Sequence, residues 1–417
     1  EGILIASSTA DNGIQAWDLK TKAKLLRYKS CVSLSYGLTC VGKNLIASSQ
    51  VREPQASFGC VLYWTWDKAQ AVVKSFPEEP VNPLLAHSDG SFLVGGGTSG
   101  NIYIWEVITG RLLRKWRAHH RSVSCLIFNE DESMLISGSE DGAVKVWPLF
   151  AIFDDDSREQ TNLHLHHFSE HMEGINSIVT GSGGCNALII SASKDRTCKV
   201  WSLSSGKMLR SVSLPTEIIA VALDSAEHVF YAGGVDGKIY IVALHAEYSS
   251  IKNQNLYVMG SFSGHSKITC LEFSYHENLL LAGSFDGTIR AWNPATRCEV
   301  HVFKLEKGPV SNIRIFRKPN SKKNNVDPLP PPLAKYANTD PNRSAILTLK
   351  DLEPVNVPYM SHVVMEEQMR EFEQQEVESY ASVSKGTKKL KTMFDKLLEF
   401  CVNEIVNESE EDERKCK

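Results

Sequence analysis

The sequence predicts an all-β fold of repeated four-stranded units, followed by an α-helical extension. The main observation is a strand–turn–strand pattern that recurs up to about residue 318. A fixed repeat period indicates units that are stacked or arranged radially, and short alternating strands with polar turns are typical of all-β proteins. Beyond residue 318 the pattern changes, first to a basic and proline-rich stretch and then to helical periodicity.

The clearest repeat runs from Ser137 to Trp147, SGSEDGAVKVW, with a tight turn at Asp141-Gly142. Related segments end on a tryptophan, or once on a valine. Neighbouring end positions are separated by 41 residues (64 to 105) to 54 residues (147 to 201). The seven end positions are Trp17, Trp64, Trp105, Trp147, Trp201, Val242 and Trp292.

Two units share a set of four polar and aromatic residues at matching positions. The two sets are His119, Ser137, Asp141, Trp147 and His171, Ser191, Asp195, Trp201. A third unit has His265, Asp286 and Trp292 but carries Ala282 where serine is expected. These segments resemble the WD-repeat β-propeller family. The resemblance implies a buried hydrogen-bond relay from the turn histidine through the strand serine to the turn aspartate and the tryptophan.

We expect these relay residues to be structural. A buried indole N–H needs a hydrogen-bond partner, and an acidic turn residue can take part in such a network. A Ser-His-Asp hydrolase site is therefore not predicted, although the residue types are the same.

The two ends of the repeat region predict closure of a ring. Residues 3–6, 14–17 and 24–28 supply three strands of a unit that lacks its innermost strand. Residues 309–316 have the inner-strand pattern and are followed by no complete unit. Pairing these ends gives a seven-bladed propeller over residues 1–318, which leaves few exposed strand edges.

Two insertions interrupt the repeats. Residues 150–168 carry three consecutive aspartates and then His164, His166 and His167. Histidines near acids can bind a metal, but this spacing matches no recognised ligand pattern, so we favour a solvated partner-binding loop. Residues 246–260 are polar and show no periodic pattern.

Residues 319–361 are predicted to be a basic and proline-rich linker. The basic run 317–325 fits a solvated linker as well as a nuclear localisation signal or a phosphate contact. The run DPLPPPL at 327–333 is typical of a polyproline spacer that holds the next segment away from the ring. Residues 345–349 could add one more edge strand.

Residues 362–408 are predicted to be a helical extension, and residues 409–417 an acidic tail. The extension carries a wide apolar stripe, and such a stripe must be covered either by the propeller or by another chain. The spacer favours another chain, through partner docking or a homodimer. The apolar stripe consists of Leu390, Met393, Phe394, Leu397, Leu398, Cys401 and Ile405.

Composition and motifs exclude several function classes. The net charge of −4 gives no global nucleic-acid footprint, and no apolar run approaches the length of a membrane span. The ten cysteines form no CxxC pair and are expected to be reduced core residues. No nucleotide-binding, metalloprotease, hydrolase or zinc motif is present, so we expect no catalytic residue, cofactor or metal.

Stretches that depart from the repeat consensus narrow the resemblance. They include residues 31–50, 105–114 and 307–312, and residues 217–234 in a unit without turn histidine or end tryptophan. With the C-terminal extension, they are similar to the WD-repeat subunit of the eukaryotic complex that matures large ribosomal subunit precursors. The similarity covers essentially the whole chain.

This resemblance implies a non-enzymatic scaffold of the nucleus, located in nucleolus and nucleoplasm. It implies an α-helical-repeat scaffold subunit as partner, removal of the second internal transcribed spacer, and recruitment of a midasin-type AAA ATPase. It also associates the C-terminal helix with pairing of two propellers. A directly RNA-binding propeller is a further alternative, but the sequence pI of about 6.4 and the lack of a basic stripe interleaved with aromatic residues argue against it, so we expect any RNA contact to be indirect or minor.

The main alternative is a substrate receptor of a cullin ubiquitin ligase. That function favours a WDxR sequence at the end of a blade. The segments after Trp17 and Trp292, WDLK and WNPA, both lack the arginine.

Overall fold

The computed structural model describes residues 2–10, 13–29, 31–50, 59–153, 163–244, 258–263, 266–317 and 329–336. The chain divides into two compact units, Glu1–His362 and Val363–Lys417. The predicted edge strand at 345–349, the helical extension at 362–408, the acidic tail at 409–417 and His265 lie outside the described residues.

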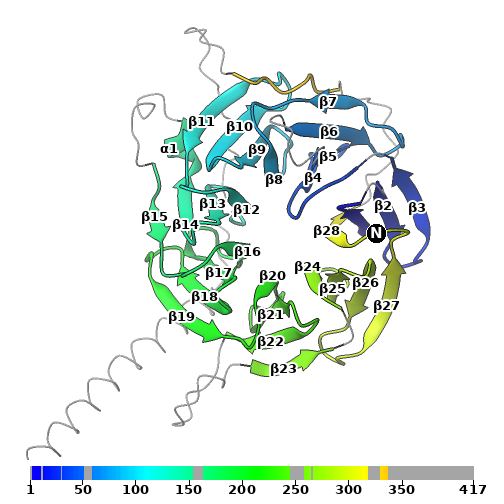
Figure 1. Cartoon of the computed structure of the whole chain (residues 1–417), viewed down its shortest axis with the longest axis vertical. Helices are drawn as coiled ribbons and strands as arrows, with labels where there is room; N and C mark the ends of the chain where they lie inside the picture. The colour runs from blue at the N-terminus through cyan, green and yellow to red at the C-terminus, as the bar shows by residue number, and fades with distance from the viewer. Residues whose placement is uncertain are drawn as a thin grey trace, which may run out of the picture. The chain divides into compact units, whose positions relative to one another are not determined.

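The described residues of the first unit contain seven four-stranded antiparallel sheets, arranged as blades around a common axis (Figure 1). The predicted seven-bladed propeller is confirmed. Blade 1 contains β28 (Val310–Arg317), β1 (Gly2–Ser8), β2 (Ile14–Asp18) and β3 (Lys24–Tyr28). Blade 2 contains β4 (Leu38–Val41), β5 (Leu45–Gln50), β6 (Cys60–Thr65) and β7 (Val73–Ser75). Blade 3 contains β8 (Val81–Ala86), β9 (Phe92–Gly97), β10 (Asn101–Glu106) and β11 (Leu112–Arg117).

The next four blades follow in chain order. Blade 4 contains β12 (Val123–Phe128), β13 (Met134–Ser139), β14 (Val144–Pro148) and β15 (His166–Phe168). Blade 5 contains β16 (Ile175–Thr180), β17 (Leu188–Ser193), β18 (Thr197–Ser202) and β19 (Met208–Ser213). Blade 6 contains β20 (Ile218–Leu223), β21 (Val229–Gly234), β22 (Ile239–Ala243) and β23 (Val258–Phe262). Blade 7 contains β24 (Ile268–Ser274), β25 (Leu279–Ser284), β26 (Thr288–Trp292) and β27 (Glu299–Lys304).

Blade 1 joins the two ends of the repeat region, as predicted. The last strand, β28, pairs antiparallel with the first, β1, from Gly2 opposite Arg317 to Ser8 opposite Val310. Asn312 reinforces this closure, because its Nδ2 donates to Ser7 Oγ at 2.8 Å and to the carbonyl oxygen of Leu34 at 2.7 Å. The closure therefore ties β28 to blade 1 and to the connection that leads into blade 2.

The hydrophobic core lies between neighbouring blades. One buried cluster, for example, combines Val94 and Ile104 of blade 3 with Leu126, Leu135 and Trp147 of blade 4. Alternating residues of each strand face opposite sides of the sheet, so every blade contributes apolar side chains to both of its neighbours.

The two predicted insertions are shorter than the sequence suggests. Residues 166–168 form β15, the outermost strand of blade 4, and Leu149–Phe153 form the short helix α1. Residues 258–262 form β23, the outermost strand of blade 6. Outermost strands pack on one side only and bury few residues, so they carry a weak periodic signal.

The proline-rich segment was expected to be a spacer held away from the ring, but it packs against the ring. Residues Leu329–Tyr336, here called the strap, lie against blades 2 and 3 and are not a spacer held away from the ring (Figure 1, yellow-orange). Leu333 is only 5% exposed and belongs to the buried cluster that contains Val107 and Leu112. Proline fixes an extended backbone without internal hydrogen bonds, so the strap's own polar groups remain available to the ring.

Candidate functional site

The relay residues of blade 4 lie together inside the blade. Trp147 Nε1 donates to Ser137 Oγ at 2.9 Å, and His119 Nε2 lies 2.8 Å from the same oxygen. His119 Nδ1 lies 3.2 Å from Asp141 Oδ2. The turn itself needs Gly142, which has a φ of 82°, and Asp141 Oδ1 accepts from the N–H of Ala143. The four residues thus connect the two middle strands, β13 and β14, and the turn between them to the loop before the innermost strand.

Blade 5 repeats this arrangement. Trp201 Nε1 donates to Ser191 Oγ at 2.9 Å, and His171 Nε2 lies 2.8 Å from that oxygen. His171 Nδ1 lies 2.9 Å from Asp195 Oδ2. In both blades the serine hydroxyl is fully buried and bonded to the histidine and the tryptophan, which supports a structural role for it.

Burial sets the protonation of these groups. Burial lowers the pKa of His119 and of His171, and the neighbouring aspartates offset this only in part. Burial alone would raise the pKa of Asp141, but hydrogen bonds from His119 and from backbone N–H groups outweigh it, so its pKa lies well below the usual range. The folded state therefore favours neutral histidine beside ionised aspartate.

The other blades depart from this pattern. Asp286 accepts from the backbone N–H and the hydroxyl of Thr288, and Trp292 is buried in blade 7. In blade 2, Ser48 occupies the register position of the relay serine, but its hydroxyl donates to the carbonyl oxygen of Ser49. Trp64 Nε1 finds no hydrogen-bond partner among the residues that the structure describes.

Blade 3 replaces the relay with a different network. Glu79 precedes its innermost strand and accepts hydrogen bonds from the hydroxyls of Tyr103 (2.6 Å) and Ser99 (2.7 Å). Burial would raise the pKa of Glu79, but these hydrogen bonds keep it below its ordinary value. In blade 3 the carboxylate thus comes from the segment before the innermost strand, whereas in blade 4 it comes from Asp141 in the turn between the two middle strands. Sequence reasoning missed Glu79, although the missing turn aspartate of this unit was a signal.

Gly95 stands where blades 4 and 5 have the relay serine. It lies opposite Tyr103, two residues after the partner of Trp105, just as Ser137 lies two residues after the partner of Trp147. Without a serine hydroxyl, Trp105 Nε1 donates to the carbonyl oxygen of Ala334 in the strap at 3.0 Å. Trp105 is thus the tryptophan that lacks the relay serine and also the one that binds the strap.

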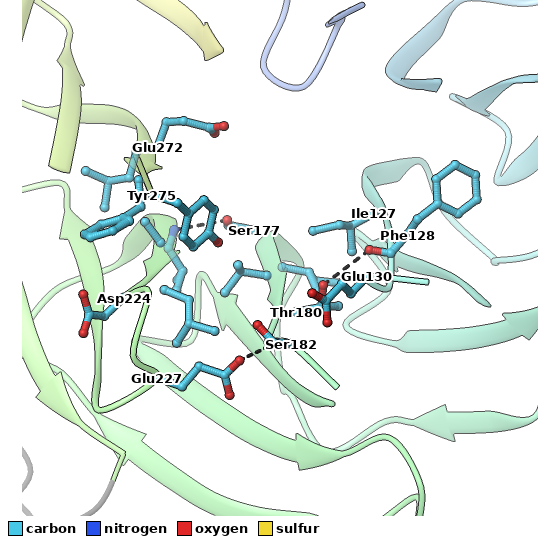
Figure 2. Close-up of a pocket in the computed structure, with 18 of the residues that line it drawn as sticks. Ile127, Phe128, Glu130, Ser177, Thr180, Ser182, Asp224, Glu227, Glu272 and Tyr275 are labelled. Carbon is cyan, nitrogen blue, oxygen red and sulfur yellow. Dashed lines mark hydrogen bonds between the residues drawn. The ribbon is translucent and has the colours of Figure 1, made fainter. Parts of the chain in front are cut away.

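A cavity of about 410 Å³ lies at the centre of the ring, between the innermost strands of blades 4 to 7 (Figure 2). Its charged lining residues are the acidic Glu130, Asp224, Glu227 and Glu272, with Arg314 as a counter-charge. Burial raises the pKa of Glu272, whose carboxylate lies 3.4 Å from Arg314 Nη1.

Two of these carboxylates already bind backbone. Glu130 Oε2 accepts from the N–H of Gly183 at 2.9 Å, and Glu227 accepts from the N–H of Ser182 (Figure 2). They connect the inner turns of blades 4 and 6 to a loop of blade 5.

Tyr36 also lines this cavity. Its carbonyl oxygen accepts from the N–H of Leu84 in blade 3, and its hydroxyl donates to Ser177 in blade 5 at 2.5 Å. Ser177 Oγ also accepts from the N–H of Val221 at 3.1 Å. Both donors engage the Ser177 hydroxyl in contacts between different parts of the ring. Sequence reasoning did not single out Tyr36, which lies in an irregular connection.

Two other kinds of site have no counterpart among the described residues. Among the residues that the structure describes, no group of three or more histidine, cysteine, aspartate or glutamate side chains could hold a metal ion. No helix in that same part of the chain is long and apolar enough to cross a membrane.

Comparisons with known proteins agree with the fold. Residues 110–148, 162–202 and 256–293 match the family described as WD domain, G-beta repeat. Among solved structures, the computationally designed Ika8 protein gives a TM-score of 0.54 at 25% identity, covering 74% of this chain and 86% of that one.

Curated relatives match over more of the chain. It is 46% identical over 394 residues to Protein ROOT INITIATION DEFECTIVE 3 of Arabidopsis thaliana, covering 89% of this chain and 88% of that protein. It is 34% identical over 315 residues to WD repeat-containing protein 18 of Homo sapiens, covering 73% and 70%. It is 28% identical over 259 residues to the pre-rRNA-processing protein crb3/ipi3 of Schizosaccharomyces pombe, covering 54% and 58%. The chain therefore belongs to the WD-repeat protein family that includes ROOT INITIATION DEFECTIVE 3 and WD repeat-containing protein 18.

Proposed function

We propose that this protein is a non-enzymatic scaffold subunit of a complex that processes pre-rRNA during assembly of the large ribosomal subunit. One observation carries the proposal: the chain aligns over most of its length with a family whose fungal members are named pre-rRNA-processing proteins. The fold is compatible with this role, because a propeller presents rigid surfaces to several partners at once.

The relay residues have a structural role in this proposal. His119, Ser137, Asp141 and Trp147, and their counterparts in blade 5, hold strands and loops of one blade together. Their atoms are buried and bonded to each other, which supports a contribution to stability and gives no support to catalysis.

Family membership also supports a proposal for the partners and the location. We infer an α-helical-repeat scaffold subunit, a midasin-type AAA ATPase on precursor particles, and a homodimer through the segment containing Leu390 to Ile405. Removal of the second internal transcribed spacer is the processing step that the complex supports, with RNA contact indirect or minor. The location is the nucleus, in nucleolus and nucleoplasm. The proposed domains are the ring (residues 1–318), the linker (319–361), the helical extension (362–408) and the acidic tail (409–417).

Affinity purification of the full chain followed by mass spectrometry and RNA sequencing tests this proposal. We expect large-subunit assembly factors together with precursor rRNA that retains the second internal transcribed spacer. Recovery of cullin and its adaptors without assembly factors would favour the ubiquitin-ligase alternative and overturn the proposal. An unrelated seven-bladed WD-repeat protein purified in parallel controls for association common to propellers.

A further inference from the structure

The strap is seated between blades 2 and 3 with contacts typical of a bound peptide. On one side, Ser75 Oγ of β7 accepts from the N–H of Leu333 at 3.0 Å. On the other, the carbonyl oxygen of Gly110 accepts from the N–H of Ala334 at 2.7 Å, and Trp105 Nε1 donates to the carbonyl oxygen of Ala334. The groove between β7 and the turn before β11 thus recognises two consecutive residues through three hydrogen bonds.

One side chain anchors the strap. Leu333 is buried in the cluster that contains Trp105, Val107 and Leu112, whereas Leu329 and Tyr336 near the strap ends are 47% and 68% exposed. The strap itself forms no strand with either blade. Because prolines 330–332 have no N–H, recognition depends on the two residues that follow them and on their extended backbone.

Two exposed apolar side chains lie close in sequence to residues that bind the strap. Phe76, which follows Ser75, is 43% exposed, and Ile108, two residues before Gly110, is 75% exposed. A ligand longer or bulkier than the strap could bury these two side chains in addition to the Leu333 site.

We propose that this groove is a peptide-recognition site for extended proline-leucine-alanine segments, and that the strap is a tethered ligand which such a segment of another protein can displace. Recognition of a preformed extended helix by an aromatic-containing groove costs little conformational entropy. A short tether supplies a local concentration in the millimolar range, so weak contacts hold the strap in place. A partner segment that also covers Phe76 and Ile108 makes contacts that the strap does not, which is the basis for displacement.

The first test opens the groove in the full chain. In Leu333→Asp the anchor becomes charged and the strap should leave, while the ring keeps its own contacts. A fluorescent peptide with the sequence of residues 329–336 should then bind, measured by anisotropy, at least ~10-fold more tightly than it binds the unchanged chain. The same peptide carrying aspartate in place of its second leucine should bind neither protein.

Two glycines provide a matched pair of variants. Gly110 (φ 68°) and Gly206 (φ 66°) occupy equivalent turns in blades 3 and 5, so alanine strains both backbones alike. A Cβ on Gly110 would meet the carbonyl oxygen of Pro332 at 2.5 Å, whereas one on Gly206 would meet the ring of His166, a side chain that can move. Combined with Leu333→Asp, Gly110→Ala should abolish peptide binding and Gly206→Ala should preserve it.

A second measurement leaves every strap contact unchanged. A protease site placed within residues 319–328 of the full chain allows the strap to be cut from the ring after folding. We expect the cut protein to exchange its strap for labelled peptide, and circular dichroism checks that both this protein and Leu333→Asp remain folded. Failure of both folded proteins to bind the peptide, or equal binding by the uncut chain, would overturn the proposal. Dimers formed by exchange of straps without capture of free peptide would overturn it as well.

Discussion

Trp147 and Ser137 are joined by a hydrogen bond of 2.9 Å that is buried within blade 4, and His119 shares the same serine oxygen. Blade 3 has Gly95 at the serine position, and its Trp105 bonds instead to Ala334, far along the chain. The change from serine to glycine therefore accompanies a change from a tryptophan that stabilises its own blade to one that holds a distant segment.

Ser137→Ala should destabilise the ring. The change leaves the indole N–H of Trp147 and the imidazole of His119 without their buried partner, which costs about 1–3 kcal/mol in free energy of unfolding. Chemical denaturation monitored by tryptophan fluorescence measures the effect. Ser48→Ala is the matched control, because Ser48 has the same register position in blade 2 but does not bind a tryptophan, so its loss should cost less. Equal costs would contradict the relay account.

Stability should fall as the pH falls below about 6.5. In the unfolded chain, histidines take up protons near that pH, whereas burial lowers the pKa of His119 and His171 in the folded chain. The unfolded state then binds more protons, so the free energy of unfolding decreases between about pH 7 and pH 5. Denaturation curves across this range measure the slope.

The double variant His119→Asn, His171→Asn should be less stable at pH 7 but show a shallower slope. His120→Asn serves as the control, because that side chain is exposed next to the relay. A slope unchanged by the double variant would show that other groups cause the acid sensitivity.

Asn312→Ala should weaken the closure of the ring. Its amide Nδ2 bonds to Ser7 and to the carbonyl oxygen of Leu34, both in segments about three hundred residues earlier in the chain. Leaving these buried acceptors without a donor costs about 1–3 kcal/mol. Hydrogen exchange read by mass spectrometry should show faster exchange in β1 and β28. The control is Val302→Ala at the exposed face of β27; equal protection of β1 and β28 in both variants would contradict the assigned role.

The C-terminal apolar stripe should govern assembly. Replacing Leu390, Phe394 and Leu397 by aspartate removes the apolar surface on which the proposed helix contact depends. Light scattering of the full chain should give a dimer for the unchanged protein and a monomer for the triple variant. Replacing Lys388, Lys391 and Lys396 by glutamine changes the polar residues of the same segment and should leave the dimer intact. An unchanged mass in the triple variant would refute this contact.

Periodicity predicted the architecture well because each blade repeats one strand–turn–strand pattern. The marker positions 17 to 292 all lie in the third strand of a blade, and the pairing of β1 with β28 followed from an incomplete first unit. The relay contacts of blades 4 and 5 were expected from the resemblance to WD-repeat propellers, which rests on the residue types at matching positions of the two units.

Contacts between distant segments were not predictable in the same way. Glu79 accepts a hydrogen bond from Tyr103 in a blade that lacks the relay histidine. Tyr36 donates to Ser177 from an irregular connection. The strap resembles a solvated linker in composition, since its docking depends on one leucine and two backbone groups. The contact between Trp105 and Ala334 joins a blade to a segment outside the repeats, so no periodic pattern marks it.

The most direct test of the account is the fate of precursor rRNA after the protein is depleted from its own cells. Probes against the second internal transcribed spacer should show accumulation of large-subunit precursors that retain it, and the full chain should restore processing. Ser48→Ala should restore it as well, which separates function from a mild change in a blade. Normal precursor levels after verified depletion would contradict a role in pre-rRNA processing.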